Sequence, residues 1–309
     1  MRSSTPIGVR YASFPRTARN PVAELTGGAV TAGDRGRRYA LTGSLRRVEE
    51  RERRFGEEGG LLSYGSYLRV DDLLAQQVLA SDPPAHDELL FITIHQVYEL
   101  WFKQLLHELS HARDGMLAGE TYVPRHALQR THVIERVLVE QVAVLETMTP
   151  QDFLAFRSLL APASGFQSVQ FREIEFLSGR RDAALVSRLQ LSDEERERLD
   201  RRLTEPSLWD AYCVLLSKRG LAVGFEDERR ESLLAVARDR ESYGDLWDVA
   251  EALVTHDELV GQWRSRHVDM VERQIGIKSG TGGSTGAPYL RSRIGVRFFP
   301  ELWELRSYL

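Results

Sequence analysis

Long stretches of the chain repeat apolar residues every three or four positions, the spacing that places them on one face of an α-helix. One such stripe crosses residues 86–118 and contains Phe91, His95, Tyr98, Phe102, Leu105 and Leu109. A second crosses residues 122–148 and contains Leu128, Val133, Val137, Val142 and Leu145. A third crosses residues 243–275 and contains Leu246, Ala250, Leu253, Val260, Trp263, His267 and Met270.

Shorter helices are expected over 165–178, 192–203 and 206–218, the last two opened by the start signals Ser192 and Glu205-Pro206. No segment alternates apolar and polar residues between hairpin turns, as exposed strands would. The pattern therefore predicts an all-α fold, a bundle of long helices.

Residues 1–60 lack apolar periodicity and are rich in Gly, Arg and Glu. We expect them to form a flexible arm, or one that packs on a neighbour, preceding a helical domain over 61–309.

Charge is unevenly divided between these two parts. Residues 1–60 hold 12 arginines and 7 acidic residues, whereas the rest holds 29 basic and 38 acidic ones. A nucleic-acid partner is not expected, because the folded part is acidic.

Two further features bear on where the chain resides. Its longest apolar runs, such as 89–94, are too short to span a bilayer, so no membrane association is expected. Cys213 is the only cysteine, so no internal disulfide can form, and a cytoplasmic location is expected.

The segment His107–His111 reads HELSH, a pattern that on a helix can place two imidazoles on one zinc ion with a glutamate as base. A catalytic zinc requires a third protein ligand, and nothing downstream resembles the extended zinc-peptidase motifs. We interpret the pattern as two histidines on the polar face of an amphipathic helix.

Residues 279–286 (SGTGGSTG) form a glycine-rich segment with hydroxyl side chains. A nucleotide site would need a strand before such a loop, and a helix precedes it here. A lid over a small polar ligand is the better interpretation, because glycine permits movement and the hydroxyls can bind.

His95 and His267 lie on apolar stripes, where a histidine is more often a core residue than a ligand. Trp263, Met270 and Val271 share the face of His267, as in the lining of a cavity for a large flat cofactor. A single axial histidine suits haem better than zinc, although periodicity alone leaves both interpretations open.

Arg157 lies among Phe153, Phe156, Leu159 and Leu160, where a buried charge requires an anionic partner. That partner is either a protein carboxylate or the carboxylate of a substrate held by the planar guanidinium.

A series of motifs runs in order along the chain from about residue 63 to 305. They are Tyr64–Leu68 (YGSYL), Ser81–Glu88 (SDPPAHDE), Phe91–Lys103 (FITIHQVYELWFK), His107–Leu109, Leu145–Pro150, Phe156-Arg157, Ser164–Ser168 (SGFQS), Ile174–Leu177, Glu205–Leu208, Trp263–His267 (WRSRH), Gly280–Ser284 and Phe298–Leu302. Together they resemble the tryptophan 2,3-dioxygenase family, and the first 60 residues fall outside the resemblance.

The resemblance implies an all-helical enzyme that encloses haem b, with His267 as the axial ligand of the iron. It also implies that His95 binds the indole N–H, Arg157 the substrate carboxylate and Thr281 the amino-acid head group. Further residues implied at the site are Phe91, Phe156 and Ser164 in the distal pocket, and Tyr64, Tyr67 and Leu68 from a segment that reaches a neighbouring subunit. A homotetramer or dimer is therefore expected.

The implied reaction inserts both atoms of O₂ across the indole C2–C3 bond of L-tryptophan, giving N-formylkynurenine without an external reductant. Three residues depart from the family pattern: Phe153 replaces a common Tyr, Ile94 a common Gln, and Tyr98 a smaller residue. A reshaped pocket leaves open a substituted tryptophan, such as a β-methyl one, oxidised to an oxindole with one oxygen atom. A haem-binding protein without turnover is the alternative from another class.

Overall fold

The computed structural model describes residues 62–281 and 286–309 of the chain, and every regular element within them is a helix. The predicted arm over 1–60 lies outside the described residues. The all-α prediction is confirmed.

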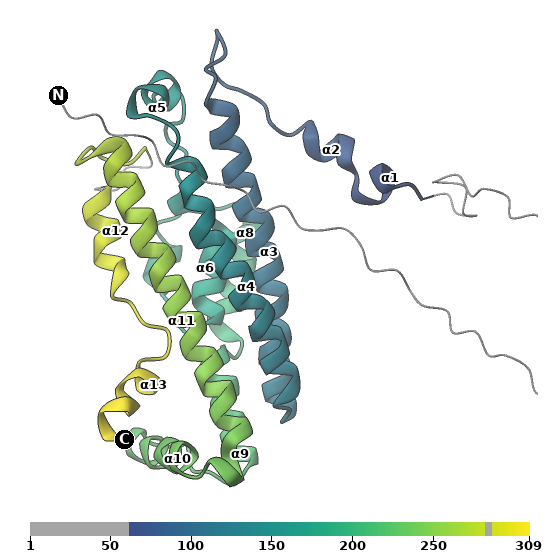
Figure 1. The fold of residues 1–309 in the computed structure, drawn as a ribbon, viewed down its shortest axis with the longest axis vertical. Coiled ribbons are helices and arrows are strands. Elements are labelled where there is room, and N and C mark those ends of the chain that lie inside the picture. Colours follow the sequence, from purple (N-terminus) through teal and green to yellow (C-terminus); the bar gives the residue numbers. More distant parts are fainter. Residues whose placement is uncertain (1–61, 282–285) are drawn as a thin grey trace, which may run out of the picture. The chain divides into compact units, whose positions relative to one another are not determined.

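Three long helices, α3 (Glu88–Ala118), α4 (Tyr122–Leu145) and α11 (Arg240–Ile275), make up most of the bundle. Helix α4 packs against both α3 and α11, and the three run side by side in Figure 1. Their bounds agree with the stripes over 86–118, 122–148 and 243–275, because each stripe is long and strongly periodic.

Shorter helices cover the remaining surfaces of the bundle. They are α1 (Tyr64–Leu68), α2 (Val70–Leu74), α5 (Pro150–Arg157), η1 (Gly165–Gln167), α6 (Val169–Leu177), α7 (Ala183–Val186), α8 (Asp193–Thr204), α9 (Leu208–Lys218), α10 (Glu226–Arg238), α12 (Ala287–Ile294), α13 (Pro300–Glu304) and η2 (Leu305–Tyr308).

Side-chain caps explain where several of these helices begin. Ser192 caps α8 and Ser207 caps α9, each accepting a hydrogen bond from the backbone three residues on. The helix expected over 165–178 is two elements, since Ser168 leaves the helical conformation and caps α6. Helix α10 was not predicted, because its sequence is mostly charged and offers little apolar periodicity.

The apolar stripe predicted on α4 is wrong at two positions. Val133 and Val137 are 55% and 41% exposed, whereas Leu128, Val142 and Leu145 are buried. Val133 lies five positions after Leu128, so its side chain points about 140° away from that of Leu128 around the helix. The buried face instead continues through Thr131, Ile134, Glu135 and Leu138, so it combines polar residues with apolar ones that the predicted stripe left out.

A buried polar cluster lies where α4, α11 and the C-terminal end of α6 meet. His256 Nδ1 is 2.5 Å from Glu135 Oε1, and its Nε2 is 2.9 Å from Ser178 Oγ. Ser178 donates its single proton to the Ile174 carbonyl, so His256 Nε2 donates to Ser178. His256 and Ser178 are fully buried and Glu135 is 2% exposed, so this serine–histidine–carboxylate row cannot reach a substrate. We interpret it as structural.

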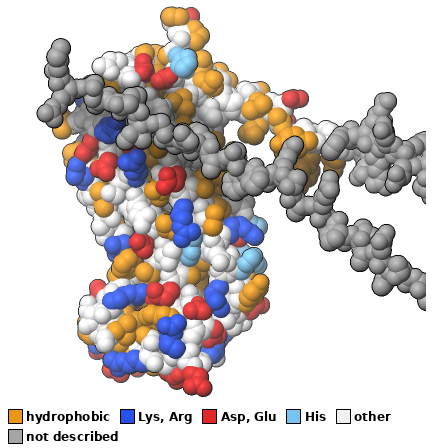
Figure 2. All heavy atoms as spheres, in the orientation of Figure 1, with side chains coloured by type: hydrophobic (Ala, Val, Ile, Leu, Met, Phe, Trp, Pro, Cys, Tyr) orange, Lys and Arg blue, Asp and Glu red, His pale blue; other side chains and the backbone are white. Residues whose placement is uncertain are grey.

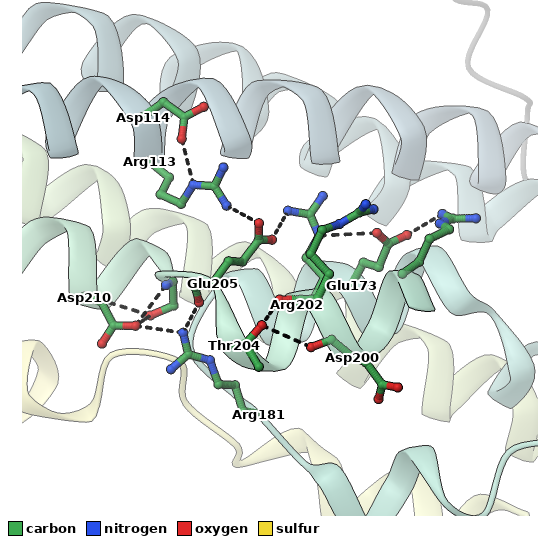
Figure 3. A network of polar contacts seen from close by, with 12 residues as sticks. Arg113, Asp114, Glu173, Arg181, Asp200, Arg202, Thr204, Glu205 and Asp210 are labelled. Carbon is green, nitrogen blue, oxygen red and sulfur yellow. Dashed lines mark hydrogen bonds and ion pairs between the residues drawn. The ribbon is translucent and has the colours of Figure 1, made fainter. Parts of the chain in front are cut away.

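A chain of ion pairs holds α6 and α8 against α3 (Figure 3). Glu205 lies 3.1 Å from Arg113 of α3 and 2.5 Å from Arg202 of α8, and Arg202 in turn lies 3.3 Å from Glu173 of α6. These contacts fix α6, which carries several residues of the site described below.

On the face shown in Figure 2, Lys and Arg side chains alternate with Asp and Glu and form no stripe of one sign. Within 62–281 and 286–309, no helix has both the length and the apolar character that crossing a bilayer requires.

We expect Glu135→Ala to lower the free energy of unfolding by about 3–5 kcal/mol, because it leaves His256 buried without its carboxylate partner. Denaturant titration measures the change. Glu140→Ala, at an exposed position of the same helix, should change it by no more than about 0.5 kcal/mol. Equal effects of the two substitutions would contradict a structural role for the buried pair.

A second prediction concerns His132, whose Nε2 contacts the Ala252 carbonyl of α11 at 2.9 Å. Burial lowers the pKa of His132 to about 4, although the Ala252 carbonyl opposes this change. An unfolded histidine titrates near 6.5, so below that pH the unfolded chain binds a proton that the native one does not. Stability should therefore fall as the pH decreases from about 6.5 to 4.

His132→Gln should make that decline shallower, whereas His111→Gln, at an exposed position, should leave it unchanged. The free energy of unfolding measured across this pH range tests the prediction. An unchanged slope in His132→Gln would refute it.

Candidate active site

A cavity of about 560 Å³ opens between α3, α6, α11 and α12, bounded also by α5 and the segment that follows it. Of the residues singled out from the sequence, Phe91, His95, Arg157, Ser164, His267 and Thr281 line it. Residues from four separated parts of the chain thus meet at one cavity of a size typical for ligand sites.

His267 lies on α11 with its imidazole stacked on the Trp263 indole, the ring centroids 5.4 Å apart and the planes at 7°. Burial lowers the pKa of His267 to about 4, and the nearby His95 contributes to this. The ring is therefore neutral near pH 7. No described residue forms a hydrogen bond with either ring nitrogen, so a nitrogen lone pair is available to a metal.

His95, on α3, has a different environment. Its Nδ1 lies 2.7 Å from the Phe91 carbonyl, which can only accept, so Nδ1 carries the proton. Burial lowers the pKa of His95, with the Phe91 carbonyl and Glu99 opposing. In the neutral ring Nε2 is thus a hydrogen-bond acceptor, suited to an N–H group of a ligand.

Three phenylalanines form an aromatic wall beside His95. The Phe91 ring lies 4.1 Å from the His95 ring and 5.6 Å from the rings of both Phe153 and Phe156. Phe91 and Phe153 line the cavity, whereas Phe156 is fully buried behind them. Phe156, which was expected to line the pocket, therefore lies one layer behind the cavity surface.

Arg157 ends α5 at the cavity edge and is partly exposed. Its Nη2 donates to the Ser279 carbonyl at 2.5 Å, and no carboxylate among the described residues pairs with it. Among the described residues, Arg157 therefore forms no salt bridge with a protein carboxylate. Most of the N–H donors of its guanidinium remain available to a ligand.

The glycine-rich segment reaches the cavity at Gly280, Thr281 and Gly286, and the remainder of it, 282–285, lies outside the described residues. Thr281 donates its hydroxyl proton to the Ala163 carbonyl at 2.6 Å. Together with the Arg157–Ser279 contact, this bond joins the segment to the chain following α5. Ser164, next to Ala163, caps η1 by accepting from the Phe166 amide.

The sequence interpretation missed a charged part of the cavity lining: Arg172 and Glu175 of α6, Arg264 of α11 and Arg293 of α12. A signal was present in two places. Arg172 and Glu175 are three residues apart on one helix, and Arg264 lies one turn before His267.

Tyr64, Tyr67 and Leu68 of α1 do not line the cavity of their own chain. They are 79%, 72% and 46% exposed, respectively. Their expected role in a neighbouring subunit stays a prediction.

Two of the three departures lie outside the cavity, which corrects the idea of a broadly reshaped pocket. Ile94 is buried in the apolar cluster with Val142 and Leu145. Tyr98 donates its hydroxyl to the Leu138 carbonyl at 2.8 Å and packs against Trp263. Only Phe153 contributes to the cavity lining.

The HELSH segment does not assemble a metal site. Glu108 is buried and accepts from Arg130 and Gln104, both at 2.8 Å, whereas His107 and His111 are exposed. Within the part of the chain that the structure describes, no three potential metal ligands of the His, Cys, Asp and Glu types lie together.

The profile of the tryptophan 2,3-dioxygenase family matches residues 47–221 and 207–309 of the chain. A protein named tryptophan 2,3-dioxygenase from a Nocardioides species is 60% identical over 260 residues, which cover 82% of this chain and 97% of that protein. Proteins of the same name from Herpetosiphon aurantiacus and Myxococcus xanthus are 46% identical over 261 residues and 40% identical over 263. These two alignments cover 80% and 81% of this chain, and 98% and 90% of the respective relatives.

Proposed function

The chain belongs to the tryptophan 2,3-dioxygenase family and is an oxidoreductase, and from this we propose that it inserts both atoms of O₂ into the indole ring of L-tryptophan to give N-formylkynurenine. The observation that carries the proposal is the meeting of His267, His95 and Arg157 at one cavity, each in the state that this reaction needs.

The cavity fits haem b by the chemistry of its donors. His267 offers a neutral imidazole nitrogen without a hydrogen-bond partner among the described residues, and its stacking on Trp263 fixes the plane of the ring. One histidine in an aromatic and apolar setting is the ligand set of a haem iron, and it is too small a set for zinc. His267 would hold the iron. When bound, the haem supplies the iron on which O₂ is activated.

The protein's own groups orient the amino acid. Arg157 would bind the substrate carboxylate with the guanidinium donors that the Ser279 carbonyl leaves free. His95 Nε2 would accept the indole N–H, and it needs no proton transfer to do so. The wall of Phe91 and Phe153 would hold the ring in place, so that catalysis by these residues is positioning.

Thr281 would contact the amino-acid head group. The Thr281 hydroxyl already donates to the Ala163 carbonyl, beside Ser164. The glycine-rich segment that carries Thr281 can therefore bring this side chain over a bound ligand. Closing such a segment would exclude water from the cavity.

The exposed side chains of α1 support an oligomer in which Tyr64, Tyr67 and Leu68 reach a neighbouring subunit's site. Two tyrosines more than 70% exposed on one short helix are unusual for an isolated surface and suited to an interface. We propose a homotetramer or dimer on this basis.

A substituted tryptophan oxidised to an oxindole is the second candidate. It is supported by Phe153, which leaves the carboxylate site one hydroxyl short of the common family pattern. This reaction inserts one oxygen atom and needs an added reductant, so product analysis by mass spectrometry with and without ascorbate separates the two candidates.

We expect His267→Ala to abolish the Soret absorbance of the purified protein, because it removes the residue that would hold the haem iron. His111→Ala, which changes an exposed histidine, should keep it. The optical spectrum and the haem content measure the outcome. Normal haem content in His267→Ala would refute the assignment of the ligand.

We expect Arg157→Gln to lower kcat/KM for L-tryptophan by roughly 10- to 100-fold, the usual effect of losing a hydrogen bond to a charged group. Phe153→Tyr should lower KM by about fivefold if the added hydroxyl reaches the carboxylate. Arg273→Gln, an exposed arginine of α11 outside the cavity, is the control. Formation of N-formylkynurenine, followed by near-UV absorbance, reports both effects, and an unchanged kcat/KM in Arg157→Gln would exclude this role.

A further inference from the structure

The charged residues lining the cavity do not balance. Four are arginines and two are glutamates, so the lining carries an excess of two positive charges when both histidines are neutral. Such an excess in a largely apolar enclosure is costly unless an anion is bound there.

The excess lies with three of the arginines. Within the cavity lining, Arg172, Arg264 and Arg293, here called the arginine cluster, have one carboxylate close by, that of Glu175. The buried Asp257, outside the lining, also acts on Arg264. Glu175 accepts from Arg172 Nη1 at 2.5 Å and from Arg264 Nη2 at 2.9 Å. A single carboxylate between two buried guanidinium groups leaves one positive charge, and Arg293 adds another.

The hydrogen-bond and ring contacts that remain to the cluster are with uncharged groups. Arg264 donates to the Val296 carbonyl at 2.9 Å and lies 5.0 Å from the centre of the Phe298 ring. Arg172 lies 4.8 Å from the Phe166 ring, and its Nε has no hydrogen-bond partner. Arg293 forms no ion pair with any described residue. Burial lowers the pKa of Arg264, and the charge of Arg293 acts in the same direction, whereas Glu175 and Asp257 oppose this change.

The other two charged residues of the lining, Glu99 and Arg157, have opposite charges and add no net charge to the count. Glu99, one turn after His95, accepts from Gln170 at 2.9 Å, and Arg157 is the last residue of α5. A zwitterionic amino acid adds no net charge to the cavity. The arginine cluster therefore keeps an excess of positive charge in the cavity lining, which carboxylates of a bound ligand would offset.

We propose that the arginine cluster is the anchor for the two carboxylates of the porphyrin, with Arg293 and Arg264 making the principal contribution. The inference rests on the proposed haem and adds how the cofactor is oriented. Arg264 precedes His267 by one turn of α11, so one helix presents both the metal ligand and a guanidinium to the same cavity. The cavity lining combines these guanidinium groups with apolar and aromatic side chains. A planar ligand with carboxylates at one edge and an apolar ring system matches such a lining.

The test compares haem b with its dimethyl ester, which has the same ring and iron but no carboxylate charge. Protein loaded with either compound is mixed with excess apomyoglobin, and the loss of the Soret signal gives the rate of release. We expect the ester to leave the unmodified protein at least about tenfold faster than haem b, the effect of losing charge-assisted hydrogen bonds.

Two variants remove charge from the cluster. Arg293→Gln breaks no ion pair, and Arg264→Gln leaves Glu175 paired with Arg172. Both should release haem b faster, so that the ratio of the ester rate to the haem rate falls toward one. Arg291→Gln is the matched control, because Arg291 lies on the same helix and pairs with Glu272 at 2.5 Å outside the cavity.

Each outcome decides the inference. Equal release of haem b and ester from the unmodified protein overturns it, while haem binding through His267 stands. A tenfold preference that Arg293→Gln and Arg264→Gln both retain also overturns it. A protein that binds neither porphyrin overturns the proposed function together with the anchor. Thermal unfolding of the ligand-free variants shows whether a loss comes from misfolding.

Discussion

The buried polar contacts of α11 fix the rotation of that helix, and the cavity depends on this setting. His256 contacts Glu135 of α4, Asp257 accepts from the Phe298 and Phe299 amides, and Arg264 contacts Glu175 of α6. Breaking any of these contacts would leave a buried polar group without its partner, which is costly. Together they permit a single rotational setting of α11. A rotation of one residue would withdraw His267 from the cavity and bury an unpaired charge.

This arrangement explains how an open cavity persists inside a helical bundle. Helix α6 is held on one face by Glu173 with the arginines of α8 and on the other by Glu175 with Arg264. It therefore cannot collapse onto α11, as apolar packing alone would favour. The same contacts that keep the cavity open also supply its charged lining.

The sequence predicted the long helices because their apolar stripes extend over many turns, and it placed His267, His95 and Arg157 at the site through the resemblance of ordered motifs. It failed along α4, where the buried face combines the polar Thr131 and Glu135 with Ile134 and Leu138, while Val133 and Val137 are exposed. It also missed Arg172 and Glu175, because a charged pair three residues apart on a helix usually lies at the surface. Only the packing of α6 against α11 makes that pair part of a cavity.

Burial, which lowers the pKa of both His267 and His95, is itself a functional requirement of the proposed site. A metal ligand and an acceptor for an indole N–H must both be neutral, and exposed imidazoles would be partly protonated near pH 6.5. The enclosure achieves this for His95 even though the nearby Glu99 carboxylate favours the protonated form. The neutral state of both histidines thus follows chiefly from the enclosure of the cavity.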